Sequence, residues 1–197
     1  MKRIYLASAS PRRHEILKQM GVSHDILTVP APAGEDEPRL SGETPQDYVI
    51  RTARDKAIRA MHWLKSAQLP VRPILTADTT VSLGDEILGK PQSISDATRM
   101  LEKLSGKTHT VQTAVVLMEE TLIYESLSTT AVTFDTLSPA DITCYANSTE
   151  PWGKAGGYGI QGTAALFITN INGSYSGVMG LPIDHTGRLL RHVGAPA

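Results

Sequence analysis

Cysteine is almost absent from this chain, since Cys144 is the single one among 197 residues. No intrachain disulfide can form, which fits a reducing compartment, and a zinc site built on several thiolates is excluded. Long apolar runs are missing too. None approaches the roughly 20 residues that a membrane-spanning helix needs, and the first residues lack the apolar segment of a secretion signal. We therefore expect a cytoplasmic protein with no membrane partner.

An excess of basic charge is also missing. The chain has 19 Lys and Arg against 20 Asp and Glu, which gives a formal net charge of −1. Proteins that bind long nucleic acids usually carry a basic excess, because neutralising phosphates supplies most of the affinity. We therefore expect no polymeric nucleic acid partner, while a small phosphorylated ligand stays possible where basic side chains cluster. Aromatic residues make up 5% of the chain, so the core must be mainly aliphatic.

Hydrophobic periodicity predicts helices that alternate with strands. The predicted helices cover residues 11–20, 44–64, 95–104, a segment from 138, and 182–193, and the predicted strands cover 4–7, 24–29, 73–77, 80–83, 86–88, 108–118, 122–134, 165–171 and 175–178. This order is typical of an α/β fold, and the two long central strands favour a mixed sheet. The length suits a single domain over residues 1–197. The helix 44–64 places Arg54 and Lys56 on opposite flanks of its apolar stripe and points Arg59 directly away from it.

The segment that joins the first strand to the first helix is a candidate phosphate site. It contains Ser8 and Ser10, then Pro11, Arg12 and Arg13. A helix N-terminus offers unpaired backbone N–H groups, hydroxyls can donate to phosphate oxygens, and arginines can clamp them. The same residues are equally consistent with a capping serine followed by two surface arginines. The glycines of a P-loop are absent.

Two acidic segments could hold a divalent cation or align a water molecule. The first is the loop Glu35-Asp36-Glu37, because Mg²⁺ prefers carboxylate oxygens. Taken alone, this triplet is more simply interpreted as a solvated charge run. The second is Asp78, which with Thr79 follows an apolar run. An acid where a buried strand emerges is often functional in α/β proteins. It could also cap a turn, but Asp is disfavoured in strands, which favours a functional role.

Two lysines lie in segments that contain glycine. Lys90 stands between Gly and Pro, and Lys154 begins a glycine-rich run that ends near Gln161. Glycines allow the backbone to approach a ligand closely, a lysine can hold a phosphate as a point charge, and a glutamine can read a base edge. A surface lysine and a flexible loop are the simpler interpretations of each segment alone.

Taken together and in order, these segments resemble the Maf nucleotide pyrophosphatases. The N-terminal match is Leu6-Ala7-Ser8-Ala9-Ser10-Pro11-Arg12-Arg13, and further matches lie at residues 36–37, 42–43, 48–49, 53–57, 77–79, 88–91, 104–106, 109, 154–156, 158–162, 172–175 and 180–182. They extend over roughly residues 4 to 183. The resemblance implies an α/β fold in which a mixed, twisted β-sheet with flanking helices forms two lobes around a cleft. It also implies kinship with the inosine triphosphate pyrophosphatases and a homodimer.

The resemblance further implies an activity. Maf enzymes hydrolyse a nucleoside triphosphate between its α- and β-phosphates, using Mg²⁺, Mn²⁺ or Co²⁺. The motifs at 10–13 and 159–162 resemble the branch that acts on dTTP and UTP, with Arg13, Thr79 and Gln161 at the positions associated with pyrimidine choice. The 7-methyl-GTP branch has a different residue after the first proline and lacks the glutamine motif. One departure is Gly89, where some members carry Glu.

The resulting hypothesis gives each residue a role in the hydrolysis of dTTP and UTP, a reaction that clears nucleotide pools. Asp78, Lys56 and Lys90 are the expected catalytic residues, and Asp78 is either the general base or a metal ligand. Asp36, Glu37 and Asp78 are the expected ligands of the divalent cation. The expected substrate-binding residues are Ser8, Ser10, Arg12, Arg13, Arg54, Thr79, Lys154 and Gln161. The alternatives are the same reaction on modified purine nucleotides such as 7-methyl-GTP, and a non-enzymatic nucleotide-binding regulator of septum formation.

Overall fold

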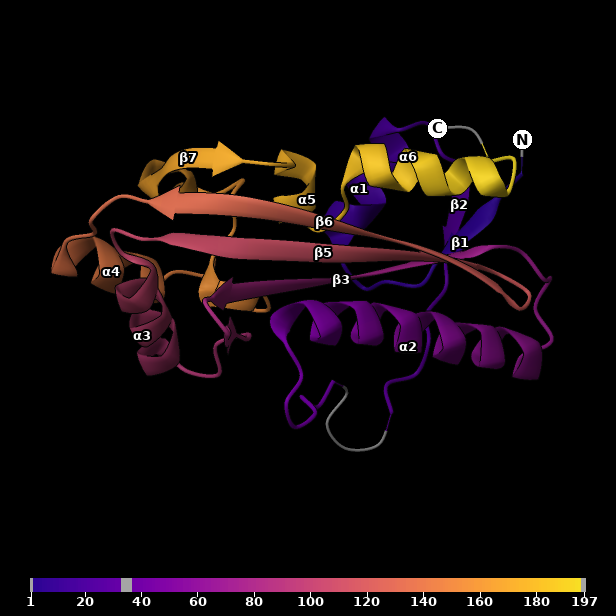
Figure 1. Cartoon of the computed structure of the whole chain (residues 1–197), viewed down its shortest axis with the longest axis horizontal. Coiled ribbons are helices and arrows are strands. Elements are labelled where there is room, and N and C mark those ends of the chain that lie inside the picture. The colour runs from indigo at the N-terminus through magenta and orange to yellow at the C-terminus, as the bar shows by residue number, and fades with distance from the viewer. Residues whose placement is uncertain (1, 33–36, 196–197) are drawn as a thin grey trace.

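The computed structural model describes residues 2–32 and 37–195 (Figure 1). Its helices are α1 (Pro11–Gln19), α2 (Pro45–Ser66), α3 (Ile94–Leu104), α4 (Pro139–Ala146), α5 (Tyr175–Met179) and α6 (Ile183–His192), with short 3₁₀ helices η1 (Ala155–Gly157) and η2 (Thr163–Phe167). Its strands are β1 (Ile4–Leu6), β2 (His24–Ile26), β3 (Ile74–Leu83), β4 (Glu86–Leu88), β5 (Thr108–Glu119), β6 (Leu122–Phe134) and β7 (Ile168–Asn172).

The strands form one mixed sheet, which confirms the predicted fold class. In the described residues the strand order is β2-β1-β3-β5-β6-β7, and β4 pairs with β3 beside this path. Strand β1 runs parallel to both β2 and β3, whereas the other pairs are antiparallel. The chain passes from β1 to β2 on one side and returns to β3 on the other. The direction of winding therefore switches between β1 and β3.

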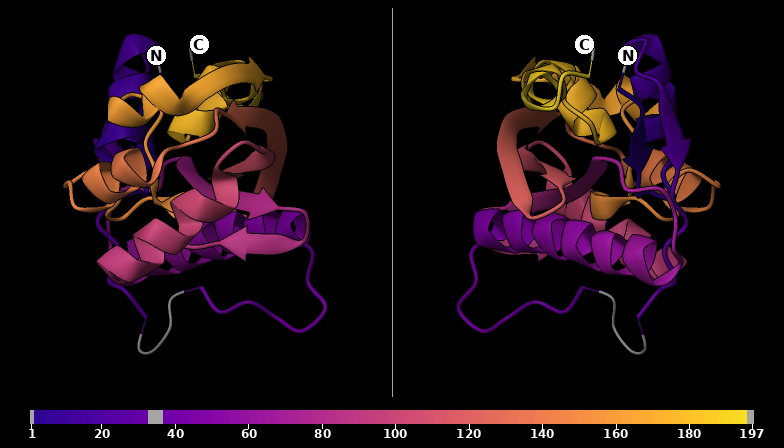
Figure 2. Two further views of the ribbon diagram at one scale, coloured as in Figure 1. Left: turned by 90° about the vertical axis from the view of Figure 1, so that its left-hand side faces the viewer. Right: turned by 90° about the vertical axis from the view of Figure 1, so that its right-hand side faces the viewer.

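Helices cover both faces of this sheet. Helix α2 packs on one face, against β3 and β5, and α6 packs on the opposite face, against β5 and β6 (Figure 1). The end-on views show α2 as one layer, with α1 and α6 across the sheet from it (Figure 2). Helices α3 and α4 pack together at one end of the sheet, and η1 lies against α3.

The alternation of side chains along the strands builds a separate core on each face. Ile74 and Val116 belong to the cluster under α2, whereas Leu75 and Leu117, their neighbours in sequence, belong to the cluster under α1 and α6. A third cluster surrounds Phe134 at the end where α3 and α4 lie. The three clusters share the long central strands, so the sheet is continuous through all of them.

Cap residues set the helix starts. Thr44 accepts a hydrogen bond from a backbone N–H of the first turn of α2, and Pro45 follows it. Ser138 and Asp141 form a capping box at α4. The helix expected from residue 95 begins at Ile94 instead, because Ser93 caps it. Among the described helices, none is both long and apolar enough to cross a membrane.

Some local predictions were wrong. The strands expected at 73–77 and 80–83 are the single strand β3, because β5 pairs with it continuously from Ile74 to Ser82 and overrides the low strand propensity of Asp. The strand expected at 175–178 is helix α5, because Ser174 caps it and Gly180 ends it with a φ of 110°. Of the strand expected at 165–171, residues 165–167 belong to η2.

Gly156 and Gly153 offer a matched test of packing around the glycine-rich segment. Both have a positive φ, 70° and 71°, so alanine would strain either backbone equally. At Gly156 a Cβ would also lie 2.9 Å from the Val81 side chain, whereas at Gly153 nothing lies within 4 Å. We expect Gly153→Ala to lower the free energy of unfolding by about 1–2 kcal/mol, and Gly156→Ala by about 1–3 kcal/mol more. Urea unfolding measures both, and equal losses would contradict this packing.

Candidate active site

A cavity of about 640 Å³ opens where one edge of β3 lacks a partner strand. Strand β1 pairs with β3 up to Leu75 and β4 pairs with it from Val81, and in the described residues no strand covers this edge in between. The uncovered stretch contributes Ala77, Asp78 and Thr79 to the cavity wall. Open α/β sheets bind ligands at such a place, outside the carboxyl ends of parallel strands where the winding switches.

Asp78 and Thr79 reach this cavity from opposite faces of the sheet, because successive side chains of a strand alternate. Asp78 accepts hydrogen bonds from side chains of α2, and Thr79 accepts one from Arg13 of α1. The expectation that Asp78 ends a strand was therefore wrong. Asp78 lies inside β3, and it reaches the cavity because no described strand pairs with this edge of β3 between Leu75 and Val81.

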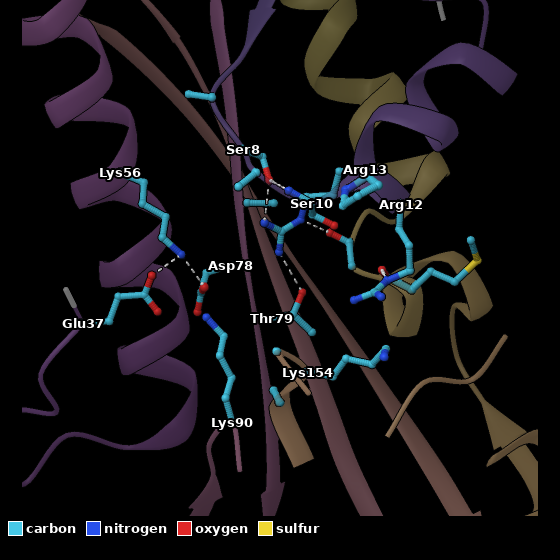
Figure 3. Close-up of a pocket in the computed structure, with 18 of the residues that line it drawn as sticks. Ser8, Ser10, Arg12, Arg13, Glu37, Lys56, Asp78, Thr79, Lys90 and Lys154 are labelled. Atoms are coloured by element: carbon cyan, nitrogen blue, oxygen red, sulfur yellow. Dashed lines mark hydrogen bonds and ion pairs between the residues drawn. The ribbon is translucent and has the colours of Figure 1, made fainter. Parts of the chain in front are cut away.

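Asp78 is held by two side chains of α2. It is 7% exposed, and one carboxylate oxygen accepts a hydrogen bond from Lys56 Nζ at 2.7 Å (Figure 3). The other oxygen accepts one from the Thr52 hydroxyl at 2.9 Å. Lys56 Nζ also lies 2.5 Å from a carboxylate oxygen of Glu37. The ammonium thus sits between two carboxylates that converge on one cation-sized position.

Arg13 joins three separate segments beneath the cavity. Its guanidinium donates to the Gly180 carbonyl at 2.8 Å, to the Ser8 hydroxyl at 3.2 Å and to the Thr79 hydroxyl at 3.2 Å (Figure 3). Thr79 also bonds Thr113 at 2.9 Å. Burial lowers the pKa of Arg13, and the nearby Asp78 carboxylate opposes that shift. Arg13 is thereby expected to position Ser8 and Thr79, because much of its hydrogen-bonding capacity is already used.

Arg12, Ser10 and Lys90, which the sequence analysis singled out, line the cavity. Arg12 Nε donates to the Met179 carbonyl at 3.4 Å. Ser10 occupies the N-cap position of α1, and its side chain makes no hydrogen bond to the described first turn of the helix. The amine of Lys90 points toward Asp78 (Figure 3).

Lys154 lies in the wall that the glycine-rich segment forms. Its amine donates to the Glu150 carbonyl. Burial lowers the pKa of Lys154, repulsion from Arg12 adds to this, and the Glu150 carboxylate opposes it. The Glu150 carboxylate accepts hydrogen bonds from the Thr163 backbone N–H at 2.8 Å and from its hydroxyl at 2.6 Å. Glu150 therefore ties the start of the segment to its end.

Two predicted residues of the described part of the chain, Arg54 and Gln161, do not line the cavity. Arg54 lies on the opposite flank of α2 from Lys56, as predicted, but it forms a bidentate ion pair with Glu125 instead of lining the cavity, so its position does not support substrate binding. Gln161 is exposed, and the neighbouring Ile160 lines the cavity. The predicted role of Gln161 stays a prediction. Asp36 lies outside the described residues.

Sequence reasoning missed three residues of the site. Arg59, expected to point away, lines the cavity one helical turn beyond Lys56, because a long side chain can reach sideways from its helix. Thr52 lies four residues before Lys56 on the same face, and this spacing was a usable signal. No local pattern indicated Glu150, whose partners come from the far end of the segment.

A divalent cation would find two carboxylates here. Among the described residues no three His, Cys, Asp or Glu side chains converge. Glu37 and Asp78 do converge, on the ammonium of Lys56. Mg²⁺ typically uses one or two carboxylates and completes its shell with substrate phosphates and water. The pair therefore fits a cation that binds together with a phosphorylated substrate.

The charge of the cavity defines a class of ligand. In the described residues its wall carries six basic side chains, Arg12, Arg13, Lys56, Arg59, Lys90 and Lys154, and two acidic ones, Glu37 and Asp78. The chain as a whole has a net charge of −1, so the basic charge is concentrated at this place. An α/β sheet with such a cavity at its switch point defines a protein that binds small polyanions such as phosphorylated metabolites.

Comparison with known proteins places the chain in the Maf family. The family model for Maf-like proteins matches residues 3–193, so the chain belongs to this family. It is 56% identical over 192 residues to a protein of Bordetella avium named dTTP/UTP pyrophosphatase, covering 98% of this chain and 96% of that protein. It is 50% identical to a protein of the same name from Cupriavidus pinatubonensis, over 95% of each chain.

Among solved structures, the Staphylococcus aureus Ham1 protein is similar to this chain at 13% identity. The likeness covers 68% of this chain and 72% of that one, with a TM-score of 0.43.

The contact between Lys56 and Asp78 can be tested by a double-mutant cycle. We expect Lys56→Met and Asp78→Asn to show a coupling of about 0.5–3 kcal/mol in the free energy of unfolding, because the pair is largely buried. The matched control is the exposed pair on the other flank of α2, where Arg54→Met and Glu125→Gln should couple by less than about 1 kcal/mol. Additive effects of the Lys56 and Asp78 variants would contradict the contact.

Proposed function

We propose that this protein is a hydrolase that converts dTTP and UTP to the monophosphate and pyrophosphate, and so clears nucleotide pools. The observation that carries the proposal is the cavity whose described wall holds six basic side chains together with Asp78, in a chain with no basic excess overall. A polyphosphate needs such a cluster, and a hydrolase also needs a group that can accept a proton from water. The relatives that match nearly the whole chain are named dTTP/UTP pyrophosphatase, and this supports the choice of pyrimidine substrates.

The chemistry requires positioning and charge stabilisation more than a covalent nucleophile. A water molecule attacks the α-phosphorus, its oxygen forms the new P–O bond, and the bond to the bridging oxygen of the β-phosphate breaks. Asp78 accepts the proton from the attacking water. For this, Lys56 must leave Asp78 and turn to the phosphates, where it neutralises charge on the departing pyrophosphate together with Lys90 and Arg12.

Glu37 and Asp78 would hold a divalent cation such as Mg²⁺, Mn²⁺ or Co²⁺, and Asp36 is a further candidate outside the described residues. A cation held there would neutralise phosphate charge and orient the α-phosphate. The convergence of both carboxylates on the Lys56 ammonium supports this assignment. A location in the cytoplasm and a homodimer remain predictions of the same hypothesis.

Ser8 and Ser10 supply hydroxyls for the phosphates, and Arg13 keeps Ser8 and Thr79 in place. Thr79 can then accept a hydrogen bond at the edge of the nucleotide, because its own proton goes to Thr113, whose hydroxyl donates to the Gly177 carbonyl. Arg54 has no part in this proposal, because it is paired with Glu125 away from the cavity. The regulator hypothesis makes a different prediction, namely tight nucleotide binding without hydrolysis.

Pyrophosphate release from a panel of nucleotides tests the proposal. We expect dTTP and UTP to be hydrolysed in the presence of Mg²⁺ or Mn²⁺, in preference to CTP, GTP and 7-methyl-GTP. Asp78→Asn should lower kcat/KM by about 10²- to 10⁴-fold, the usual contribution of a general base. Glu125→Gln, across α2 from the cavity, is the matched control and should keep full activity.

Each other outcome of this assay has a defined meaning. Preference for 7-methyl-GTP would keep the reaction and overturn the pyrimidine choice. Intact nucleotides in a folded protein that binds them would support the regulator instead. Full activity in Asp78→Asn would remove Asp78 from the mechanism.

The pH dependence of KM tests the role of Lys154. Only the protonated amine attracts phosphate, and burial lowers the pKa of Lys154 below its ordinary value of 10.5. We therefore expect KM for UTP to rise as the pH increases through that lowered pKa, which lies below 10.5. In Lys154→Arg the guanidinium stays charged over the same pH range, so KM for UTP should not change with pH. An identical rise in both proteins would show that another group is responsible.

A further inference from the structure

Trp152 is a partly exposed aromatic residue that lines the cavity. It is 39% exposed. In the described lining the other aromatic side chain is Tyr158, which is 5% exposed and whose hydroxyl is bonded to His109 at 2.7 Å. Trp152 is therefore the aromatic residue of this described wall that a ligand in the cavity could contact over a large area. Large apolar side chains exposed beside a cavity commonly mark a binding surface.

The orientation of this ring is restrained by its surroundings. The indole N–H donates to the Ser148 carbonyl at 3.1 Å, so the polar edge of the ring is already satisfied within the protein. Two residues before the ring, Glu150 accepts hydrogen bonds from both the backbone and the hydroxyl of Thr163. A ring held in this way loses little conformational freedom when a ligand packs on it, which favours binding.

The charges beside Trp152 narrow the class of ligand. Lys154 lies two residues further along the same wall, and Arg12 is close enough to Lys154 to lower its pKa. An aromatic surface followed by two cations suits a molecule in which a flat ring is attached to a polyanion. A nucleotide has this composition, because every nucleobase offers a π-face for stacking and its phosphates carry the negative charge.

We propose that Trp152 is the platform on which the nucleobase stacks when a nucleoside triphosphate occupies the cavity, with the phosphates directed toward Arg12 and Lys154. The inference rests on the proposed function, since it concerns the same cavity and substrate. Stacking tolerates different bases. Trp152 therefore supplies affinity for any nucleotide, and the choice between bases must come from polar groups around it.

Steady-state kinetics and a ligand without a base separate stacking from a structural role. Trp152→Leu, which keeps an apolar side chain but loses the π-face, should raise KM for UTP about 5- to 100-fold, with kcat changed less than twofold. Trp152→Phe should restore most of the affinity. Tripolyphosphate has no ring, so its inhibition constant should be the same in wild-type and Trp152→Leu proteins.

Tryptophan fluorescence gives an independent readout, because the chain contains two tryptophans. The second, Trp63, lies on α2 and is 37% exposed, but it does not line the described cavity. In Trp63→Phe the emission comes from Trp152 alone, and we expect it to be quenched by α,β-imido-UTP and left unchanged by tripolyphosphate. In Trp152→Phe the emission of Trp63 should respond to neither ligand.

The results distinguish this inference from the proposed function. The stacking proposal is overturned if the wild-type protein hydrolyses UTP and Trp152→Leu has the same KM. It is also overturned if the emission of Trp152 does not change when α,β-imido-UTP is added. Neither result contradicts the proposed hydrolase activity. Equal losses of affinity for UTP and tripolyphosphate would also overturn the stacking proposal, because they would indicate a disturbed phosphate site. If the wild-type protein releases no pyrophosphate from any nucleotide, the proposed function itself fails, and binding of the analogue still tests Trp152.

Discussion

Between Leu75 and Val81, strand β3 has a partner on only one side in the described structure, and the arrangement of the site follows from this gap. In a strand paired on both edges, the side chains of Asp78 and Thr79 would lie on opposite faces, separated by the sheet. The open edge instead lets two adjacent side chains enter one cavity from opposite faces. Asp78 is consequently supported by α2, and Thr79 is supported by Arg13 of α1. On its other side β3 pairs with β5 without interruption from Ile74 to Ser82, so this stretch remains part of the sheet.

The electrostatics of the cavity are arranged for a ligand with several negative charges. The positive charge of Lys56 is paired with the carboxylates of Glu37 and Asp78. The guanidinium of Arg13 donates hydrogen bonds to Ser8, Thr79 and Gly180. Lys154 is different, since burial and Arg12 both disfavour its charged form. The negative charge of bound phosphates would offset this electrostatic cost and stabilise the protonated amine of Lys154. Part of the binding energy for a triphosphate is thus expected to come from groups that the protein itself leaves imperfectly compensated.

Much of this architecture was predictable from sequence patterns. The helix spacing of α2 put Lys56 and Arg54 on different flanks, and the structure places the first beside Asp78 and the second beside Glu125. The residues between β1 and α1 were also expected at the cavity. These predictions succeed because each depends on local periodicity or on the strand-to-helix junction.

The failures have a common physical origin in long-range contacts. A break was expected at Asp78 because the propensity of Asp opposes a strand, but pairing with β5 decides the backbone there. Arg59 reaches the cavity because of the way α2 packs on the sheet. Glu150 holds the glycine-rich segment because Thr163, at the far end of that segment, donates a hydrogen bond to its carboxylate. Such contacts depend on how separate elements meet in space, and a single sequence does not contain that information in a local pattern.

The central claim is that water attacks the α-phosphorus of a triphosphate held in this one cavity. Hydrolysis of UTP in water enriched in ¹⁸O, followed by mass spectrometry of the products, tests it most directly. We expect one ¹⁸O atom in the UMP and none in the pyrophosphate. Label in the pyrophosphate, or formation of UDP and inorganic phosphate, would place the attack on a different phosphorus and contradict the assigned arrangement of Asp78 and the basic side chains.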